Sequence, residues 1–276
     1  MTKTIITTSN VTKPKVLVFS GYGLNCEEET KFAFDLAGAS TDIVHINDLI
    51  DKKYMLKNYQ ILAFQGGFSY GDDNGAGNAF DNKIRNHLWR DLQVFVKNNT
   101  LIIGICNGFQ IISNLGLLPA LNTQYGTRET ALVPNNSSRY TVRFVDLIIE
   151  NKTPWFRGIK QLSVPIAHGE GKFYTTKKIL SELNAKNLIS AKYISGEICS
   201  FQSLDANPNG SLEDIASITD ESGRIIGMMP HPERAIFFTQ LPNWFLLKEK
   251  YLRQKKNIPT YGPGLQVFQN AVQYFK

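Results

Sequence analysis

The alternation of short apolar runs with stretches of helical character between residues 15 and 114 constrains the fold more than any other feature. VLVF (16–19) precedes CEEETKFAFDLAG, which has carboxylates in its first turn and Gly38 at its end, as helices do. DIVHI (42–46) and ILAF (61–64) follow as strands, and the second leads into the glycine-rich loop QGGFSYGDD. This alternation predicts βα units built around a parallel sheet.

The remaining segments extend this pattern and then change it. Apolar residues recur at helical spacing between residues 82 and 98, which predicts one helix, and LIIGI (101–105) is typical of a strand covered on both faces. After residue 122 longer alternating segments appear, and DIASITD and RIIGMMP, joined by Glu221, Ser222 and Gly223, predict a hairpin. No linker divides the 276 residues, so we expect a single domain, 1–276, with a short N-terminal extension at 1–14.

Composition excludes several classes of protein. Hydrophobic residues make up 42% and charged residues 20% of the chain, as in ordinary globular proteins. Three scattered cysteines form no disulfide framework or CxxC zinc motif, and no apolar run reaches the roughly 18 residues of a membrane span. A net charge of +6 is a dispersed excess that gives little support to nucleic-acid binding. We therefore expect a soluble, cytoplasmic protein without a membrane or nucleic-acid partner.

The segment GICNGFQ (104–110) places Cys106 directly after an apolar strand, with a glycine two positions before it and another two after it. A nucleophile on a tight strand-to-helix turn projects from the sheet edge, and small neighbours are needed because the backbones approach closely. The helix N-terminus favours the thiolate, and the amide of Asn107 can face a substrate oxyanion. This pattern predicts that Cys106 is a nucleophile rather than a buried apolar side chain, the common role of a free cysteine.

MMPHPER (228–234) offers the partner that a cysteine nucleophile requires. It follows another apolar strand, and the ordinary pKa of a histidine such as His231 suits both proton removal and proton donation near neutrality. Glu233, two residues further on, can orient the imidazole and stabilise its charged form, while Pro232 stiffens the turn. Taken alone, a His-Pro-Glu loop is more often structural, so its weight comes from its combination with Cys106.

GICNGFQIISNLGLLP, QGGFSYGD, VPIAHGEGKFY, NPNGS and MMPHPER together resemble the glutaminase subunits of phosphoribosylformylglycinamidine synthases, which are class I (triad) glutamine amidotransferases. The resemblance implies an α/β fold, a flavodoxin-like sandwich whose mostly parallel central sheet has helices on both faces. It also implies a triad of Cys106, His231 and Glu233. By the same resemblance Gly67 joins Asn107 in the oxyanion hole, and the substrate-binding residues are Gln110, His168 and Glu170.

The resemblance further implies a function and partners. Glutamine is hydrolysed to glutamate and ammonia, which passes to a synthetase subunit that makes formylglycinamidine ribonucleotide in purine biosynthesis. ATP and magnesium belong to that subunit, a small bridging subunit completes the complex, and the chain itself needs no cofactor or metal; it contains no GxxxxGK[ST] phosphate loop. The chain departs from the family at Gln65, where proline is usual, and in an insertion at 235–263 that carries LPNWFLL and the basic run 248–256, which we interpret as a solvated helix face.

Two other functions remain open from the residues alone. Gly-x-Cys-x-Gly also occurs in cysteine hydrolases that do not use glutamine, so a stand-alone hydrolase or peptidase of related fold is one alternative. A non-catalytic regulatory subunit that retains the fold is the other, although the presence of all three triad residues argues against it.

Overall fold

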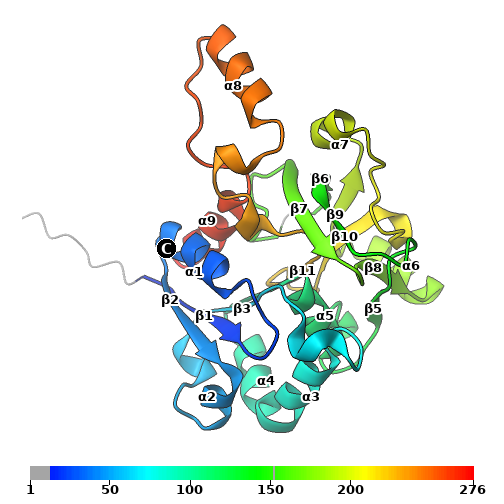
Figure 1. Ribbon diagram of the computed structural model, residues 1–276. Helices are drawn as coiled ribbons and strands as arrows, with labels where there is room; N and C mark the ends of the chain where they lie inside the picture. Colours follow the sequence, from blue (N-terminus) through cyan, green and yellow to red (C-terminus); the bar gives the residue numbers. More distant parts are fainter. Residues whose placement is uncertain (1–12, 152) are drawn as a thin grey trace, which may run out of the picture.

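The computed structural model describes residues 13–151 and 153–276, so residues 1–12 of the predicted N-terminal extension lie outside the described residues. Its centre is one sheet (Figure 1), in which nine strands of the described residues follow the order β2-β1-β3-β4-β11-β10-β9-β6-β7. These strands are β1 (Lys15–Ser20), β2 (Ser40–His45), β3 (Ile61–Phe64), β4 (Leu101–Ile105), β6 (Thr141–Ile149), β7 (Gln161–His168), β9 (Ile189–Ile194), β10 (Ile215–Thr219) and β11 (Ile225–Met228). A separate antiparallel pair joins β5 (Thr130–Val133) and β8 (Lys172–Thr175).

The half of the sheet from β2 to β11 is parallel. Its order, with β1 between β2 and β3, is that of flavodoxin-like folds. Every residue of β3, β4 and β11 is buried, as expected for strands covered on both faces. The predicted α/β fold is therefore confirmed, with its parallel strands in the half that carries Cys106.

The other half of the sheet, from β10 to β7, is antiparallel. The predicted hairpin is present: β10 and β11 pair antiparallel, with Ser217 opposite Met228. Because β11 also pairs parallel with β4, this hairpin joins the two halves into one sheet.

Helices cover both faces of the parallel half. The connection from β1 to β2 moves toward one edge of the sheet, whereas the connections from β3 to β4 and from β4 onward move toward the other edge. Because such crossovers are right-handed, the helices of the two groups lie on opposite faces. On one face the rings of Phe34 and Phe268 meet edge-on, with centroids 4.9 Å apart, and join α1 to α9. None of the helices in the described ranges is long and apolar enough to cross a membrane. The helices are α1 (Glu27–Leu36), α2 (Ile46–Ile50), α3 (Asn78–His87), α4 (Trp89–Lys97), α5 (Asn107–Asn114), α6 (Lys177–Ala185), α7 (Glu197–Gln202), α8 (Trp244–Arg253) and α9 (Leu265–Gln273).

The single helix predicted between residues 82 and 98 is wrong in its continuity. The chain forms α3 and α4, which are separated at Leu88, where φ is −121° and ψ is 0° and the backbone leaves the helical region. The apolar face was predicted correctly, because Ile84, Leu88 and Leu92 are all buried. The spacing of apolar residues identifies which side chains face the core. It does not reveal a break in the helix that leaves the same side chains buried.

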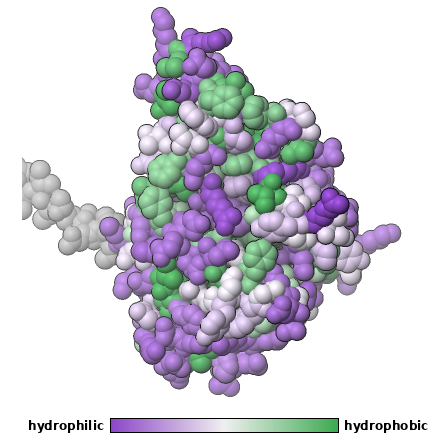
Figure 2. All heavy atoms as spheres, viewed as in Figure 1, coloured by the Kyte–Doolittle hydropathy of each residue, from purple (hydrophilic) through white to green (hydrophobic). Residues whose placement is uncertain are grey.

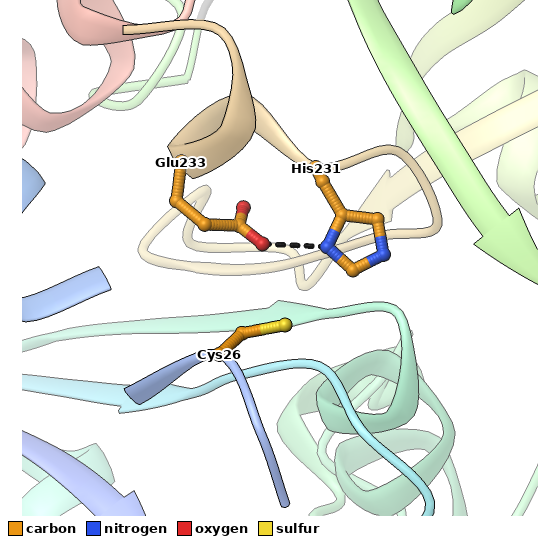
Figure 3. A group of neighbouring side chains, drawn as sticks. All are labelled: Cys26, His231 and Glu233. Atoms are coloured by element: carbon orange, nitrogen blue, oxygen red, sulfur yellow. Dashed lines mark hydrogen bonds and ion pairs between the residues drawn. The ribbon is translucent and has the colours of Figure 1, made fainter. Parts of the chain in front are cut away.

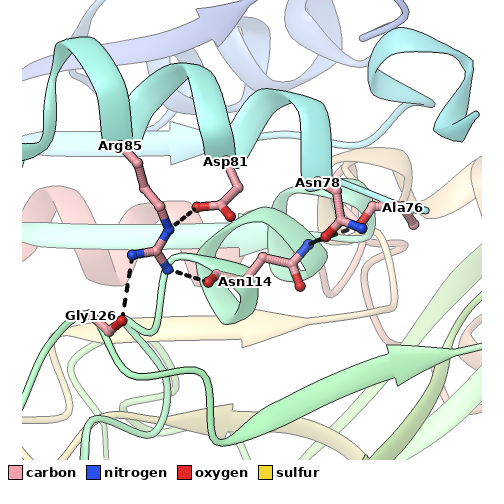
Figure 4. Close-up of polar contacts among 6 residues, drawn as sticks. All are labelled: Ala76, Asn78, Asp81, Arg85, Asn114 and Gly126. Atoms are coloured by element: carbon pink, nitrogen blue, oxygen red, sulfur yellow. Dashed lines mark hydrogen bonds and ion pairs between the residues drawn. The ribbon is translucent and has the colours of Figure 1, made fainter. Parts of the chain in front are cut away.

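Polar contacts fasten α5, the helix that follows Cys106, to α3 (Figure 4). Arg85 of α3 pairs with Asp81 at 2.8 Å and donates to the carbonyl oxygens of Asn114 and Gly126. The Asn114 side chain donates in turn to the Ala76 carbonyl at 3.0 Å. A cation at the C-terminus of a helix also interacts favourably with the helix dipole. The helix is thus held at the end opposite to Cys106.

Glycines allow α5 to lie directly against the sheet. A methyl group at Gly108 would overlap with the Phe64 carbonyl oxygen of β3. A methyl group at Gly104 would lie 2.7 Å from the Gly108 carbonyl oxygen and 2.6 Å from the Ile112 side chain. The two glycines that flank Cys106 therefore set the distance between helix and strand, as the sequence pattern predicted.

The insertion at residues 235–263 projects away from the sheet and carries α8, seen in orange at the top of Figure 1. No residue of α8 is buried, and Phe245, Leu246 and Leu252 are about half exposed. Figure 2 shows apolar side chains grouped on this upper part of the visible face, above a mainly hydrophilic lower part. The basic run 248–256 is exposed except at Tyr251, as expected of a solvated helix face.

We expect Gly108→Ala to lower the free energy of unfolding by about 3 kcal/mol, because the added methyl group must push α5 away from β3. Urea denaturation followed by circular dichroism measures the change. Gly169→Ala is the matched control, since its methyl group would meet no heavy atom closer than 3.9 Å. Equal stability of the two variants would contradict this account of the packing.

Candidate active site

Cys106 lies at the turn between β4 and α5, as the sequence predicted. Its backbone has φ 52° and ψ −109°, a left-handed φ that is costly for a residue other than glycine. The turn is held on the sheet side because the Cys106 amide donates to the Met228 carbonyl of β11 at 2.8 Å. The thiol is 4% exposed and lies 3.6 Å from the Ala167 carbonyl oxygen. The sulfur therefore lies at the N-terminus of α5, beside the backbone of β7.

His231 and Glu233 form a buried pair directly after β11 (Figure 3). The chain enters a short 3₁₀ helix, η5 (Pro232–Arg234), which turns the Glu233 side chain back toward the imidazole. Nδ1 of His231 lies 2.5 Å from Oε1 of Glu233, and the residues are 1% and 2% exposed. The His231 amide donates to the Pro165 carbonyl of β7 at 2.8 Å, which fixes the start of this turn. The Glu233 carboxylate thus lies where it can hold the His231 ring in one orientation.

The pKa of His231 is raised well above 6.5. Burial is the largest single influence and lowers the pKa, but the attraction of Glu233 and the charge of Cys106 together outweigh it. The imidazole is therefore charged in the resting protein. Because its pKa in the folded state exceeds that of an unfolded chain, this charge contributes stability that is complete below about pH 6.5. The contribution is lost as the pH rises through the folded-state value.

The Gly67 amide follows the end of β3, and the Asn107 amide lies at the start of α5, directly after Cys106. Neither amide donates to a protein acceptor within residues 13–151 and 153–276. Gly67 has φ +147°, and a methyl group there would lie 2.6 Å from Cα of Leu24. Position 67 therefore requires glycine, because the backbone of residues 23–25 passes directly against it. Two unpaired amides at the ends of adjacent strands are suited to an oxyanion.

Gln110 and Glu170 meet beside the nucleophile, but not through the Glu170 side chain. The Gln110 amide donates to the Glu170 backbone carbonyl at 2.6 Å and accepts from the Asn107 side chain at 2.8 Å. Both ends of this amide are therefore engaged within the protein. Asp72, which also accepts from Asn107 at 3.3 Å, joins the same network.

His168 is buried at the end of β7, with 2% of its surface exposed. Its Nδ1 lies 3.1 Å from Oδ1 of Asn135, which also accepts from the Gly171 amide. Burial and then repulsion by His231 lower the pKa of His168 to about 3, so its imidazole is neutral. A methyl group at Gly171 would overlap the imidazole, which explains the glycine that follows Glu170 in this motif.

Several residues at the site were not identified from the sequence. Asn135 holds the His168 loop through three contacts, but it lies far from the motifs in the chain and carries no local signal. Asp72 belongs to a motif that was recognised, and burial raises its pKa to about 6. Cys26 was not assigned to the site from the sequence, but its sulfur lies within 4.8 Å of a His231 ring nitrogen and a Glu233 carboxylate oxygen. It also accepts a hydrogen bond from Arg234 at 2.9 Å.

Comparison with known proteins first gives the class. A family model described as a CobB/CobQ-like glutamine amidotransferase domain matches residues 13–275. Two solved structures share the fold: a putative GMP synthase subunit from Thermoplasma acidophilum, with a TM-score of 0.52, and a glutamine amidotransferase from Thermotoga maritima, with a TM-score of 0.51. Both are 14% identical to this chain, so the likeness is one of fold alone. The matches cover 95% of this chain and 94% and 96% of those chains, respectively. The fold and the site therefore define a glutamine amidotransferase.

More similar proteins give the family. A phosphoribosylformylglycinamidine synthase subunit PurQ from Methanococcus maripaludis is 50% identical and the match covers 95% of this chain and 98% of that protein. The PurQ subunit from Dehalococcoides mccartyi is 39% identical, with 96% and 98% covered. The structure of PurLQS from Thermotoga maritima matches with a TM-score of 0.68 and 28% identity, covering 96% of this chain and 100% of that chain. The chain belongs to the PurQ family, which confirms the resemblance drawn from its sequence.

We expect Glu233→Gln to lower the pKa of His231, because burial then acts on the imidazole without the attraction that offsets it. An NMR titration of the imidazole protons measures the change in the wild-type chain and in the variant. His168 is the internal control, since it stays neutral in both. An unchanged titration of His231 would show that the carboxylate does not set its charge.

Proposed function

We propose that this chain is the glutaminase subunit of a phosphoribosylformylglycinamidine synthase, acting through Cys106, His231 and Glu233. The observation that carries the proposal is the combination of a thiol on a strained strand-to-helix turn with a buried imidazole and carboxylate 2.5 Å apart. Membership of the PurQ family supports the choice of substrate and complex.

The first step is attack of the Cys106 thiolate on the side-chain amide carbon of glutamine. The carbonyl oxygen becomes an oxyanion, which accepts hydrogen bonds from the Gly67 and Asn107 amides. His231 begins charged and donates its proton to the departing ammonia, leaving a glutamyl thioester on Cys106. Burial of the imidazole helps this transfer, because it already opposes the charged form.

The second step is hydrolysis of the thioester. The neutral His231 now removes a proton from water, which attacks the thioester carbon and releases glutamate and the Cys106 thiolate. Glu233 keeps the ring oriented through both steps, because it holds Nδ1 while Nε2 exchanges protons. The same imidazole therefore serves as acid and then as base.

Three further residues shape the substrate mouth in this proposal. Gln110 holds the glutamine side chain only after releasing one of its two protein contacts, so its first role is to fix the Glu170 loop beside Cys106. His168 is neutral and buried, which suits a positioning role for that loop rather than proton transfer. The charge of Glu170 helps to raise the pKa of Asp72, after the larger effect of burial, so these two acidic residues act on each other near the Gln110 network.

The ammonia then passes to a synthetase subunit, where ATP and magnesium act, and a small bridging subunit completes the assembly. The relative from Thermotoga maritima was solved as PurLQS, a name consistent with such an assembly for that protein. Within this scheme the chain works as one domain, has no cofactor of its own, and is located in the cytoplasm.

We expect Cys106→Ala to abolish glutamine-driven synthesis by the reconstituted complex, by about 10³-fold or more, while ammonia-driven synthesis continues. The variant removes only the nucleophile, so the partner still receives external ammonia. Product formation from glutamine and from ammonium salt measures both reactions. Cys199→Ala, at another buried free cysteine, is the matched control and retains both.

Other outcomes would separate the alternatives. Loss of both reactions, or of neither, would contradict the assignment. A chain that cleaves peptides but ignores free glutamine would be a stand-alone hydrolase. Persistence of glutamine-driven synthesis in Cys106→Ala would favour a non-catalytic subunit.

A further inference from the structure

Cys26 lies against the catalytic pair but has no role in the proposed reaction. It is fully buried at the N-terminus of α1. Its sulfur, a His231 ring nitrogen and a Glu233 carboxylate oxygen all lie within 4.8 Å of one another. Figure 3 shows these side chains facing one another, with the Cys26 sulfur beneath the imidazole and carboxylate. A thiol, an imidazole and a carboxylate thus converge at one buried point.

The Glu233 carboxylate at this point has an oxygen that accepts no hydrogen bond from the described residues. Oε2 of Glu233 is buried and has no hydrogen-bond partner in the part of the chain that the structure describes. A buried carboxylate oxygen without a donor is costly, so a bound cation would satisfy it. Thiolate, imidazole and carboxylate are together the ligands that zinc prefers, and three of them leave a fourth position for water.

We propose that Cys26, His231 and Glu233 form a binding site for a thiophilic divalent cation, represented by Zn²⁺, and that the bound ion inhibits glutamine hydrolysis. The metal bonds to Sγ of Cys26, Nδ1 of His231 and a carboxylate oxygen of Glu233. The thiol proton and the proton on Nδ1 are released to solvent as these bonds form, so no other reactant is needed. No metal takes part in the catalytic steps proposed above.

The geometry requires only a small adjustment. Zinc-to-donor distances of 2.0 to 2.3 Å place tetrahedral donor atoms about 3.5 Å apart, so the widest pair would move together by about 1 Å. Nδ1 of His231 and Oε1 of Glu233, which lie 2.5 Å apart, would have to separate by about 1 Å once the proton between them is released. Gly66 lies directly against this point, since a methyl group there would be 2.6 Å from the imidazole and 3.1 Å from the Cys26 sulfur. A glycine here leaves the imidazole and sulfur free to approach each other.

Arg234 is compatible with the bound metal despite its charge. Its Nη2 donates to the Cys26 sulfur at 2.9 Å. Sulfur has further lone pairs for the metal, and hydrogen-bond donors to a ligand atom commonly remain in place around a metal site. The Glu233 carboxylate and the Cys26 thiolate supply two negative charges, which offset all but one of the three positive charges of the cation and the guanidinium.

Inhibition follows because the metal occupies Nδ1 of His231. With Nδ1 bonded to a cation, His231 loses the proton that it shares with Glu233 and keeps the proton on Nε2. Giving that proton to ammonia would leave an imidazolate, and while it stays on Nε2 the ring cannot remove a proton from water, so both proposed steps are impaired. This inhibition rests on the proposed catalytic roles of His231 and Glu233, whereas the binding of the metal does not.

Metal binding is tested with Co²⁺ as a spectroscopic substitute for zinc, added to the full chain carrying Cys106→Ala. We expect a thiolate-to-cobalt charge-transfer band, because only Cys26 among the remaining cysteines lies near the imidazole. The band should vanish in Cys106→Ala with Cys26→Ser and persist in Cys106→Ala with Cys199→Ala, the matched control. Absence of the band in Cys106→Ala, or its survival after Cys26→Ser in a folded chain, would overturn the proposal.

Inhibition is tested with Zn²⁺ on glutamine hydrolysis by the reconstituted complex. We expect half-maximal inhibition of Cys26→Ser to need about tenfold more zinc than the wild type or more, with Cys199→Ala unchanged and activity restored by a chelator. Equal zinc sensitivity of Cys26→Ser and wild type would place the metal on Cys106 and contradict the proposal. A chain that binds cobalt through Cys26 yet never hydrolyses glutamine would instead contradict the proposed function.

Discussion

The contact of α5 with β3 and β4 is the constraint on which the rest of the site depends. Gly104 and Gly108 remove the side chains that would hold helix and strands apart, and this forces the intervening residue, Cys106, into a left-handed turn. Backbone strain of this kind persists only where the surroundings determine it. Here the Arg85 contacts fix the far end of α5, and β11 holds the turn itself.

Burial gives the pair of His231 and Glu233 its chemical character. In water, a histidine beside a glutamate would exchange its partner for solvent, but neither His231 nor Glu233 has solvent within reach. The interaction between them is strengthened in this poorly polarisable surrounding, and the desolvation cost works against the charged imidazole at the same time. These opposing effects leave an imidazole that is charged at rest yet able to lose its proton. His168, which lacks a carboxylate partner, is neutral in an otherwise similar environment.

Local patterns in the sequence were sufficient for the strand, turn and helix around Cys106, for the hairpin before His231 and for the α/β class, because each of these depends on neighbouring residues. The break at Leu88 was missed, since both arrangements bury the same apolar face. The contacts of Asn135 and Cys26 with the site could not be predicted either. They join segments more than 30 residues apart, and their positions depend on how the completed sheet is folded.

Strand β7 lies at the far edge of the nine-stranded sheet from β2, yet its backbone supports the site at two points. Its Pro165 carbonyl accepts from the His231 amide, and its Ala167 carbonyl lies beside the Cys106 sulfur. Strand β7 of the antiparallel half thus lies against the C-terminal ends of β4 and β11 in the parallel half. A fragment containing only the flavodoxin-like half would have Cys106 without the β7 backbone that confines its sulfur, so the complete environment of Cys106 exists only in the whole sheet.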